Sequence, residues 1–262
     1  MPTAEFATPL RWALITGASD GIGRAFALEL GKQGFGCILV ARRKDRLKAL
    51  AQTIGFEKCR ILAMDLSDPG SVTRLASLIS DRPIDLLVAA AGYGTSGEFV
   101  LADRGNELAM IDLNCRAVAE LVHVIGAGMI RRRSGGIILF SSLVAFQGVP
   151  RSANYAATKA YIQTFAEGLR PELRPFGVDV LSVAPGPIAS GFAARAGLTL
   201  GMSQTPDVVA RQSLKALGKK TTVRPGWLAK LLIGSLSMLP RGTRTRIMTQ
   251  IMAGMTANDP QR

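Results

Sequence analysis

The sequence predicts a single α/β domain in which helices cover both faces of a mainly parallel sheet. Short apolar runs alternate with longer segments of helical length. Strands that are apolar on both faces are typical of a buried parallel sheet, and this alternation is typical of α/β proteins. No internal repeat or low-complexity linker divides the 262 residues. We therefore expect one domain over residues 1–262, with a basic, partly apolar extension from about residue 225 to residue 262.

Seven strands and at least five helices follow from this pattern. The expected strands are Trp12–Thr16, Gly36–Val40, Arg60–Met64, Ile84–Ala89, Gly136–Phe140, Val178–Val183 and, more weakly, Thr221–Arg224. The expected helices are Gly21–Gln33, Arg43–Ile54, Val72–Ile79, Asp103–Arg132 and Ala153–Leu173. Pro171 and Pro175 are expected to mark the end of the last helix.

The formal net charge is +13, and the segment from Val208 to Asn258 holds nine Lys and Arg residues but no Asp or Glu. Such a balance suits an anionic ligand or an anionic membrane surface. The basic residues form no recognition motif and few aromatic residues lie among them, so we expect no nucleic-acid partner. Trp227–Ile233 has an apolar stripe with basic neighbours, which leaves open a contact with a membrane surface. Packing of this segment on the domain or on a partner subunit is the favoured alternative.

Three sequence features that this chain lacks predict its cellular location: paired cysteines, a secretory signal and a membrane-spanning segment. The three cysteines form no CxxC pair, so we expect no zinc site, no other metal site and no disulfide framework. The N-terminus lacks the pattern of a secretory signal. The apolar run Trp227–Leu239 contains Lys230 and is shorter than the roughly 20 residues needed to cross a bilayer. A cytoplasmic protein, with peripheral membrane contact left open, is the prediction.

A glycine-rich turn follows the first expected strand and opens the first expected helix. Its sequence is Thr16-Gly17-Ala18-Ser19-Asp20-Gly21-Ile22-Gly23. Glycines allow a tight turn and a close approach of the backbone to a ligand, and a helix N-terminus favours negative charge. This arrangement suits the pyrophosphate of a dinucleotide, although a glycine triplet also occurs in ordinary strand–helix turns.

The end of the second expected strand indicates which dinucleotide is bound. It reads Ala41-Arg42-Arg43-Lys44, and no acidic residue stands at positions 40 to 44. Folds that prefer NAD usually place an acid here to hold the ribose 2′-hydroxyl. Arg42 can instead bind a 2′-phosphate, so we expect NADP(H). We interpret Arg43 and Lys44 as a solvated helix start, and Asp65 as a residue that can reach the adenine.

Tyr155 and Lys159 lie four residues apart on an expected helix, and Ser142 precedes Tyr155. Residues i and i+4 share one helix face, so the ammonium can favour the phenolate and help the tyrosine to act as an acid or base. An exposed surface pair is the alternative interpretation. Ser142 can equally be a serine that satisfies a backbone group at the end of a strand.

Taken together, these motifs resemble the short-chain dehydrogenase/reductase family over nearly the whole chain. The matching residues are the glycine turn, Asp65-Leu66, Ala91-Gly92, Asn114, Ser142, Tyr155, Lys159 and Pro185-Gly186. The nearest resemblance is to NADP-dependent ketone reductases and hydroxysteroid dehydrogenase-like proteins. It implies a Rossmann fold with strand order 3-2-1-4-5-6-7, hydride transfer between a nicotinamide and a carbonyl or alcohol carbon, and a homodimer or homotetramer.

The resemblance also implies a role for each matching residue. Tyr155 is the general acid or base, Ser142 binds the carbonyl oxygen, Lys159 contacts the nicotinamide ribose, and Asn114 kinks its helix and holds a water molecule. The implied catalytic residues are therefore Asn114, Ser142, Tyr155 and Lys159. The implied cofactor-binding residues are Gly17, Ser19, Asp20, Gly21, Ile22, Gly23, Arg42, Asp65, Leu66, Ala91, Gly92, Tyr155, Lys159, Pro185, Gly186 and Ile188.

Two features qualify these expectations. Ala89-Ala90 stands where the family usually has two asparagines, so we expect a lost hydrogen bond and a looser central sheet. The segment Ile188–Leu200 is small and apolar, which favours a hydrophobic substrate.

The alternative function is a non-catalytic dinucleotide-binding sensor or scaffold, to which Ala89-Ala90 and the basic tail lend support. The single His123 has no partner acid or nucleophile in a motif, so a hydrolase triad is not expected.

Overall fold

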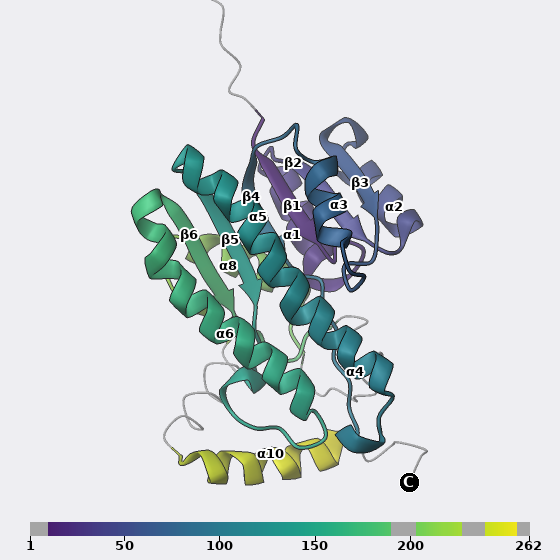
Figure 1. Cartoon of the computed structure of the whole chain (residues 1–262), viewed down its shortest axis with the longest axis vertical. Coiled ribbons are helices and arrows are strands. Elements are labelled where there is room, and N and C mark those ends of the chain that lie inside the picture. The colour runs from purple at the N-terminus through teal and green to yellow at the C-terminus, as the bar shows by residue number, and fades with distance from the viewer. Residues whose placement is uncertain (1–9, 190–202, 227–238, 256–262) are drawn as a thin grey trace, which may run out of the picture.

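A computed structural model describes residues 10–189, 203–226 and 239–255 of the chain. Seven parallel strands form one sheet in the order β3-β2-β1-β4-β5-β6-β7, which confirms the predicted Rossmann-type topology (Figure 1). The strands are β1 (Trp12–Thr16), β2 (Gly36–Ala41), β3 (Cys59–Ala63), β4 (Ile84–Ala89), β5 (Gly135–Phe140), β6 (Val178–Val183) and β7 (Thr222–Val223).

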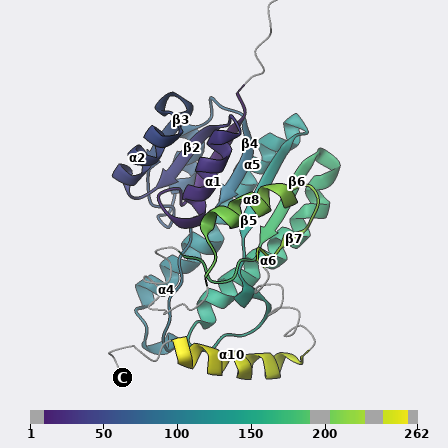
Figure 2. The ribbon, with the colours of Figure 1, turned by 180° about the vertical axis from the view of Figure 1, so that it is seen from behind.

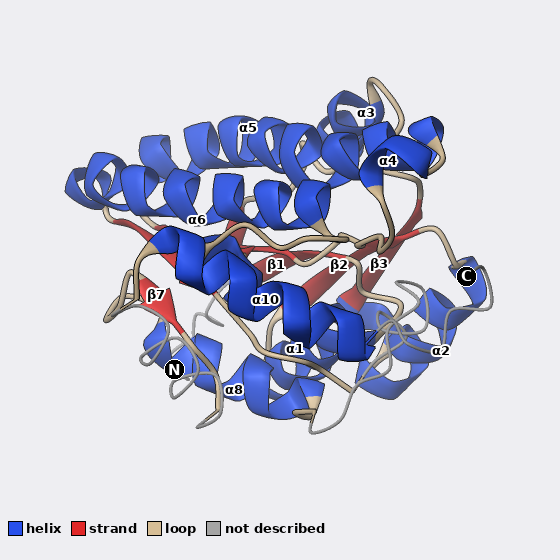
Figure 3. Cartoon of the chain, turned by 90° about the horizontal axis from the view of Figure 1, so that it is seen from below, coloured by secondary structure: helices blue, strands red, loops and turns tan. Residues whose placement is uncertain are grey.

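Helices cover both faces of this sheet, as Figure 3 shows. The longer helices α5 (Ala117–Arg132) and α6 (Ala153–Leu173) lie on one face with α3 (Ser71–Leu78) and α4 (Arg104–Ile111). The helices α1 (Gly21–Lys32), α2 (Lys44–Ile54) and α8 (Pro206–Ala216) lie on the other (Figure 2). Short 3₁₀ turns occupy Phe56–Lys58, Phe99–Leu101, Leu143–Phe146 and Arg174–Phe176.

The sheet separates two hydrophobic cores, and neighbouring residues of one strand enter different cores. In β1, for example, Leu14 belongs to the core beneath α5 and α6, whereas Ile15 belongs to the core beneath α1 and α2. Both side chains are fully buried. The strands therefore need mostly apolar residues, which is why they read as apolar runs. The charged exceptions are Arg60, Asp85 and Asp179, each at the second position of its strand.

One prediction about a helix was wrong in detail, and another was confirmed. The expected continuous helix Asp103–Arg132 is interrupted by a π-helical turn, Asp112–Arg116, between α4 and α5. The helix α6 has the predicted bounds, so its end at Leu173 lies between Pro171 and Pro175 as expected. A proline so close to a helix C-terminus removes a single backbone hydrogen bond, and the chain then continues into the 3₁₀ turn that contains Pro175.

The last described helix, α10 (Arg241–Met255), lies across the end of the molecule toward which the strands point (Figures 1 and 3). Its Met248 packs against Val149 and Ala156, so it covers the loop after β5 and the start of α6. Among the described residues, no helix has both the length and the apolar character needed to span a bilayer. Trp227–Ile233 lies outside the described residues, and the single-domain organisation of residues 1–262 stays a prediction.

Candidate active site

The glycine turn connects β1 to α1 and requires glycine at two positions. Gly17 has a φ of 67°, and a Cβ there would lie 2.8 Å from the carbonyl oxygen of Ala90. A Cβ on Gly23 would collide with the carbonyl group of Gly17. The turn is therefore packed tightly onto the end of β4, and the N-terminus of α1 follows it directly.

Thr16 braces the end of β4, where the family's asparagines are replaced by alanines. Its Oγ1 accepts a hydrogen bond of 3.0 Å from the backbone N–H of Ala91. Ala89 keeps its register with Thr16 in β1 and with Leu139 in β5. The expected loosening is not visible as a break in the sheet, because the threonine holds the backbone that follows Ala89.

Asp20 caps α1 and forms ion pairs with two arginines at the start of α2. Its carboxylate accepts from the N–H of Gly21 at 2.8 Å and pairs with Arg43 at 3.3 Å and Arg46 at 3.2 Å. Burial raises the pKa of Asp20, but the hydrogen bonds from Gly21 and Arg43, together with the charge of Arg46, outweigh it and lower the pKa overall. The carboxylate is thus held in its charged form at the glycine turn.

Arg43 therefore corrects the expectation of a solvated helix start. Its guanidinium also donates to Ser19 Oγ, from Nη2 at 3.1 Å and from Nε at 3.3 Å. The side chain bridges the end of β2 to the glycine turn. The sequence offered one signal for this, namely the position of Arg43 directly after Arg42 at the end of a strand.

Arg42 lies beside the same turn and pairs with Asp65. The distance from Nη1 to Asp65 Oδ2 is 3.2 Å, and 62% of the Arg42 side chain is exposed. The other carboxylate oxygen of Asp65 accepts from the N–H of Ser67 at 3.0 Å and from its hydroxyl at 2.7 Å. Burial raises the pKa of Asp65, but these bonds and Arg42 lower it overall. Leu66 is buried in the core, so only its backbone can face a ligand.

Asn114 lies in the π-helical turn and is almost fully buried. Its Nδ2 donates to the carbonyl oxygen of Tyr93 at 2.9 Å and to Thr158 Oγ1 at 3.1 Å, and its Oδ1 accepts from the N–H of Tyr93 at 3.2 Å. One amide thus ties the loop after β4 to α6. A π turn often marks a functional position, and here it coincides with the expected helix irregularity.

Tyr155 and Ser142 are hydrogen-bonded to each other, and Lys159 lies on the same side of α6. The Lys159 ammonium is 5.7 Å from the centre of the Tyr155 ring and donates to the carbonyl oxygen of Phe140 at 2.9 Å. Ser142 Oγ also accepts from the N–H of Val144 at 3.4 Å, so it caps the 3₁₀ turn Leu143–Phe146 as well. Ser142 and Tyr155 remain partly exposed, whereas Lys159 is buried.

Burial is the largest cause of the pKa shifts of Tyr155 and Lys159. It raises the pKa of Tyr155 to about 12, and the hydrogen bond with Ser142 acts in the opposite direction. Burial lowers the pKa of Lys159 to about 8, and the nearby Cys115 acts in the opposite direction. The expected lowering of the Tyr155 pKa by Lys159 is not observed: burial raises this pKa, and the opposing effect comes from the hydrogen bond with Ser142.

Gly92, a predicted cofactor-binding residue, lies next to two of the predicted catalytic residues. A Cβ there would lie 2.9 Å from Asn114 Oδ1 and 3.6 Å from Lys159 Nζ. After β6, the carbonyl oxygen of Pro185 accepts from the N–H of Leu143 at 3.1 Å, beside Ser142. Gly186 follows Pro185 and is partly exposed. Ile188 is buried and forms an isolated bridge with Gln204.

These residues fit a dinucleotide. The glycine turn, the Ala91-Gly92 pair and the Pro185-Gly186 pair follow β1, β4 and β6, so they share the edge of the sheet where the strands end. Ligands of open parallel sheets bind at this edge. The amides of the first turn of α1 and the two arginines supply donors for phosphate groups. Among the described residues, no group of His, Cys, Asp and Glu could hold a metal ion.

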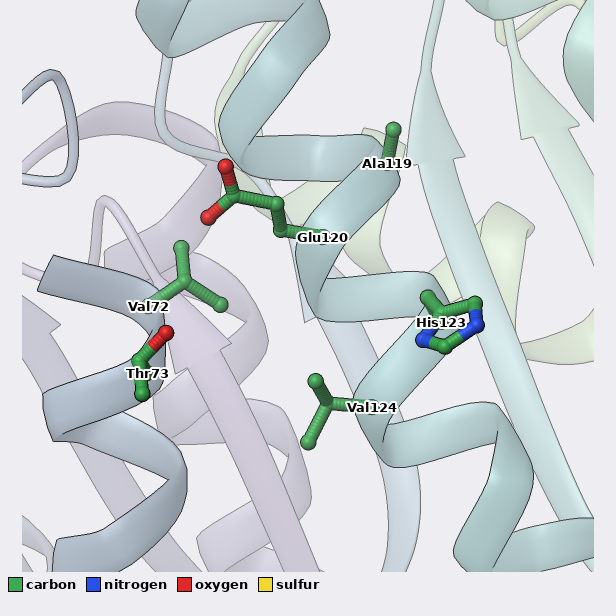
Figure 4. A pocket seen from close by; sticks show the side chains of 6 residues that line it. All are labelled: Val72, Thr73, Ala119, Glu120, His123 and Val124. Atoms are coloured by element: carbon green, nitrogen blue, oxygen red, sulfur yellow. The ribbon is translucent and has the colours of Figure 1, made fainter. Parts of the chain in front are cut away.

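A groove between α3 and α5 does not belong to this site. Figure 4 shows its lining, which comes from Val72, Thr73, Ala119, Glu120, His123 and Val124. His123 lies on the exposed side of α5. None of the six residues was predicted to bind the cofactor or to act in catalysis.

Comparison with known proteins identifies the family. A family model described as short chain dehydrogenase matches residues 11–199. The chain belongs to the short-chain dehydrogenases. It is therefore an oxidoreductase that interconverts CH–OH and C=O groups.

Curated relatives of this dehydrogenase include enzymes for large apolar molecules and one protein named as inactive. The chain is 31% identical to a 7beta-hydroxysteroid dehydrogenase of Clostridium sardiniense over 225 residues, which cover 83% of this chain and 86% of the relative. It is 29% identical to a very-long-chain 3-oxoacyl-CoA reductase of Ajellomyces capsulatus, over 96% of this chain and 75% of the relative. An inactive hydroxysteroid dehydrogenase-like protein 1 of Pongo abelii is 30% identical, over 81% of this chain and 68% of the relative.

Among solved structures, the dehydrogenase is similar to a short-chain dehydrogenase from Sphingobium yanoikuyae in complex with NADPH. The TM-score is 0.78 and the identity 28%, over 91% of this chain and 95% of that one.

Proposed function

We propose that the protein is an NADP(H)-dependent dehydrogenase or reductase for a hydrophobic ketone or secondary alcohol, with Tyr155 as its general acid and base. The observation that carries the proposal is the grouping of Tyr155, Ser142 and Lys159 beside Gly92 at the edge where the strands end. Asn114 completes the group through its bonds to Tyr93 and Thr158.

In this proposal the bound nicotinamide supplies or accepts the hydride, and the protein handles the proton. During reduction, Tyr155 donates its phenolic proton to the carbonyl oxygen, and during oxidation it takes a proton from the alcohol. Ser142 gives up its hydrogen bond with Tyr155 when the substrate binds, and its hydroxyl then donates to the same carbonyl oxygen and stabilises the negative charge that develops there. In this proposal the Lys159 ammonium, 5.7 Å from the centre of the Tyr155 ring, favours the phenolate when the bound cofactor and substrate exclude water from the site, because charges attract each other more strongly where water is excluded.

The preference for NADP(H) is supported by charge. Arg42 and Arg43 lie beside the glycine turn, and no acid stands at positions 40 to 44. Two guanidinium groups at this place suit a 2′-phosphate, which an acid would repel. The NADPH complex of the Sphingobium relative supports the same assignment.

A hydrophobic substrate is supported by the relatives and by the sequence after β6. The names of two relatives indicate a steroid and a very-long-chain acyl group carried on coenzyme A, and both the steroid and the acyl chain are large and apolar. Most of the apolar segment Ile188–Leu200 lies outside the described residues, so its lining role stays a prediction.

The decisive experiment replaces Tyr155 with phenylalanine. A panel of steroid ketones, long-chain 3-oxoacyl thioesters and small ketones is tested with NADPH, and turnover is followed as loss of reduced-nicotinamide absorbance. We expect Tyr155→Phe to lower kcat by about 10³-fold or more while the Kd of NADPH stays within about twofold, because the ring is kept and only the proton donor is lost. Tyr161→Phe, an exposed tyrosine on the same helix, is the matched control. Unchanged turnover in Tyr155→Phe would refute the mechanism.

A non-catalytic dinucleotide-binding sensor or scaffold is the second candidate, and the relative named as inactive favours it. The complete set of Asn114, Ser142, Tyr155 and Lys159 argues against it. The same panel separates the two, since NADPH binding without turnover on any substrate class would support the sensor.

We further propose a cytoplasmic homodimer or homotetramer. The three cysteines are free in the structure, as suits a reducing compartment. Exposed apolar side chains occur on the outer helices, namely Leu108, Ile111, Val124 and Tyr161. Light scattering after gel filtration measures the mass, and a particle of 27.8 kDa, the mass of one chain, would contradict the oligomer.

A further inference from the structure

A buried carboxylate lies next to the first turn of α6 and outside the group of residues that the family motifs identify. Glu107, in α4, is 6% exposed. A charged group so deeply buried requires a polar partner. Asn154 provides one, since its Nδ2 donates to Glu107 Oε2 at 2.6 Å and to the carbonyl oxygen of Glu107 at 3.1 Å. Asn154 immediately precedes Tyr155.

The first turn of α6 needs such an anchor. The first N–H groups of any α-helix lack partners within the helix, so its first turn is the least constrained. The N-terminal residue Ser152 makes no side-chain capping bond; its hydroxyl donates instead to the carbonyl oxygen of Thr95. Residues outside α6 therefore hold the turn that carries Tyr155. Within this turn, Asn154 is the residue that bonds to a buried charged group.

The partner helix is itself tied to the site. α4 leads directly into the π-helical turn that carries Asn114. The hydroxyl of Tyr93 donates to the carbonyl oxygen of Asn106 at 2.6 Å, one residue before Glu107. Asn114 holds the backbone of the same tyrosine. The bond between Glu107 and Asn154 therefore joins the element that positions Asn114 to the element that positions Tyr155.

We propose that Glu107 and Asn154 are positioning residues whose hydrogen bond sets the orientation of the first turn of α6, so that the Tyr155 hydroxyl faces Ser142. The inference rests on the proposed role of Tyr155. Because Asn154 and Tyr155 are adjacent in the helix, a rotation of this turn that releases Asn154 also turns the phenol away from Ser142. The charge on Glu107 strengthens the bond, since charge-assisted hydrogen bonds are short and strong.

The test exchanges donor and acceptor. Asn154→Asp places two carboxylates together and breaks the bond, whereas Glu107→Gln with Asn154→Asp restores a donor on one side and an acceptor on the other. Glu107→Gln alone is the conservative control, because the amide oxygen can still accept from Asn154. Three quantities are measured on the full-length protein: kcat and KM with NADPH, the Kd of NADPH, and amide hydrogen exchange of the peptide spanning residues 149–160.

We expect Asn154→Asp to lower kcat about 10- to 100-fold, as a misplaced proton donor does, with the Kd of NADPH within about twofold and faster exchange in the peptide. The double variant should recover kcat to within about threefold of Glu107→Gln, together with slow exchange. Wild-type kcat in Asn154→Asp, or a double variant that stays impaired, would overturn the inference. If the wild-type protein turns over no substrate, the proposed function fails, and the exchange data alone then decide whether the bond holds the turn. Faster exchange with unchanged kcat would also overturn the inference, since the bond would then not position Tyr155.

Discussion

The ammonium of Lys159 is a charge that folding buries at a cost. Its pKa falls from 10.5 to about 8 chiefly through burial. The bond to the Phe140 carbonyl keeps the group in place without cancelling this cost. Buried polar groups of this kind persist where function requires them, at the expense of stability. We therefore expect Lys159 to lower the free energy of unfolding while it serves the chemistry of the site.

The pH dependence of unfolding tests this conflict. A lysine with a lowered folded-state pKa destabilises the protein fully below that pKa, and the penalty is relieved as the pH rises from about 8 toward the unfolded value of 10.5. Tyr155 acts in the opposite sense, since its raised pKa contributes stability below pH 10 that is lost between pH 10 and about 12. Measurements at pH 7 and 9.5 therefore report mainly on Lys159.

We predict that Lys159→Met raises the free energy of unfolding at pH 7 by roughly 1 to 3 kcal/mol and abolishes turnover. The difference from wild type should narrow by pH 9.5. Urea denaturation without cofactor measures both values. Lys48→Met, at an exposed position of α2, is the control and should change stability by less than about 0.5 kcal/mol at either pH. A destabilised Lys159→Met at pH 7 would show that the bond to Phe140 outweighs the cost of burial.

At the scale of the elements, the junction between β2 and α2 places two arginines differently. Arg42 points to Asp65, which follows β3, and Arg43 points back to the glycine turn between β1 and α1. Three neighbouring strand ends thus contribute to one charged region, in which arginines after β2 pair with Asp20 and Asp65. A 2′-phosphate bound there must compete with Asp20 and Asp65 for the guanidinium groups, so both arginines are expected to contribute to its binding.

We predict that Arg42→Ala and Arg43→Ala each weaken NADPH binding about tenfold, or about 1.4 kcal/mol, while NADH binding stays within about twofold. The 2′-phosphate is the only group that distinguishes the two ligands. Calorimetric titration gives both Kd values. Arg60→Ala is the control, because Arg60 pairs with Asp81 near the opposite end of β3. Equal weakening of NADPH and NADH would mean that the arginines do not contact the 2′-phosphate.

For the whole molecule, charge is distributed unevenly, and α10 carries part of the excess. Arg241 and Arg246 are exposed on this helix at the lower end of Figure 1. The 3₁₀ turn before α4 exposes Phe99, Val100 and Leu101 by 56%, 85% and 79%. Exposed apolar groups and exposed basic residues both favour binding to the surface of an anionic membrane, from which an apolar substrate would be delivered.

We predict that the protein pellets with vesicles that contain anionic phospholipid at low salt and is released as salt is raised, because the attraction is screened. Arg241→Glu with Arg246→Glu should reduce pelleting. Lys219→Glu with Lys220→Glu changes the same number of exposed charges near the start of β7 and should have the smaller effect. Absence of pelleting by the wild-type protein at low salt would exclude the membrane contact.

The sequence by itself determined the topology and the motif residues. Apolar runs predicted the bounds of all seven strands to within one residue at either end, because a strand buried on both faces needs mostly apolar side chains. The glycine turn was equally readable, since no other residue fits at Gly17 or Gly23.

Only the tertiary structure decided which side chains meet across distant elements. Four contacts illustrate this: Arg43 to Ser19, Thr16 to Ala91, Asn114 to Thr158 and Asn154 to Glu107. Each joins residues between 24 and 75 positions apart in the sequence. Local propensity carries no information about these partners. The pKa values of Tyr155 and Lys159 also depend on the tertiary structure. Burial is the largest cause of both shifts, and the spacing of the two residues along the helix gives no measure of burial.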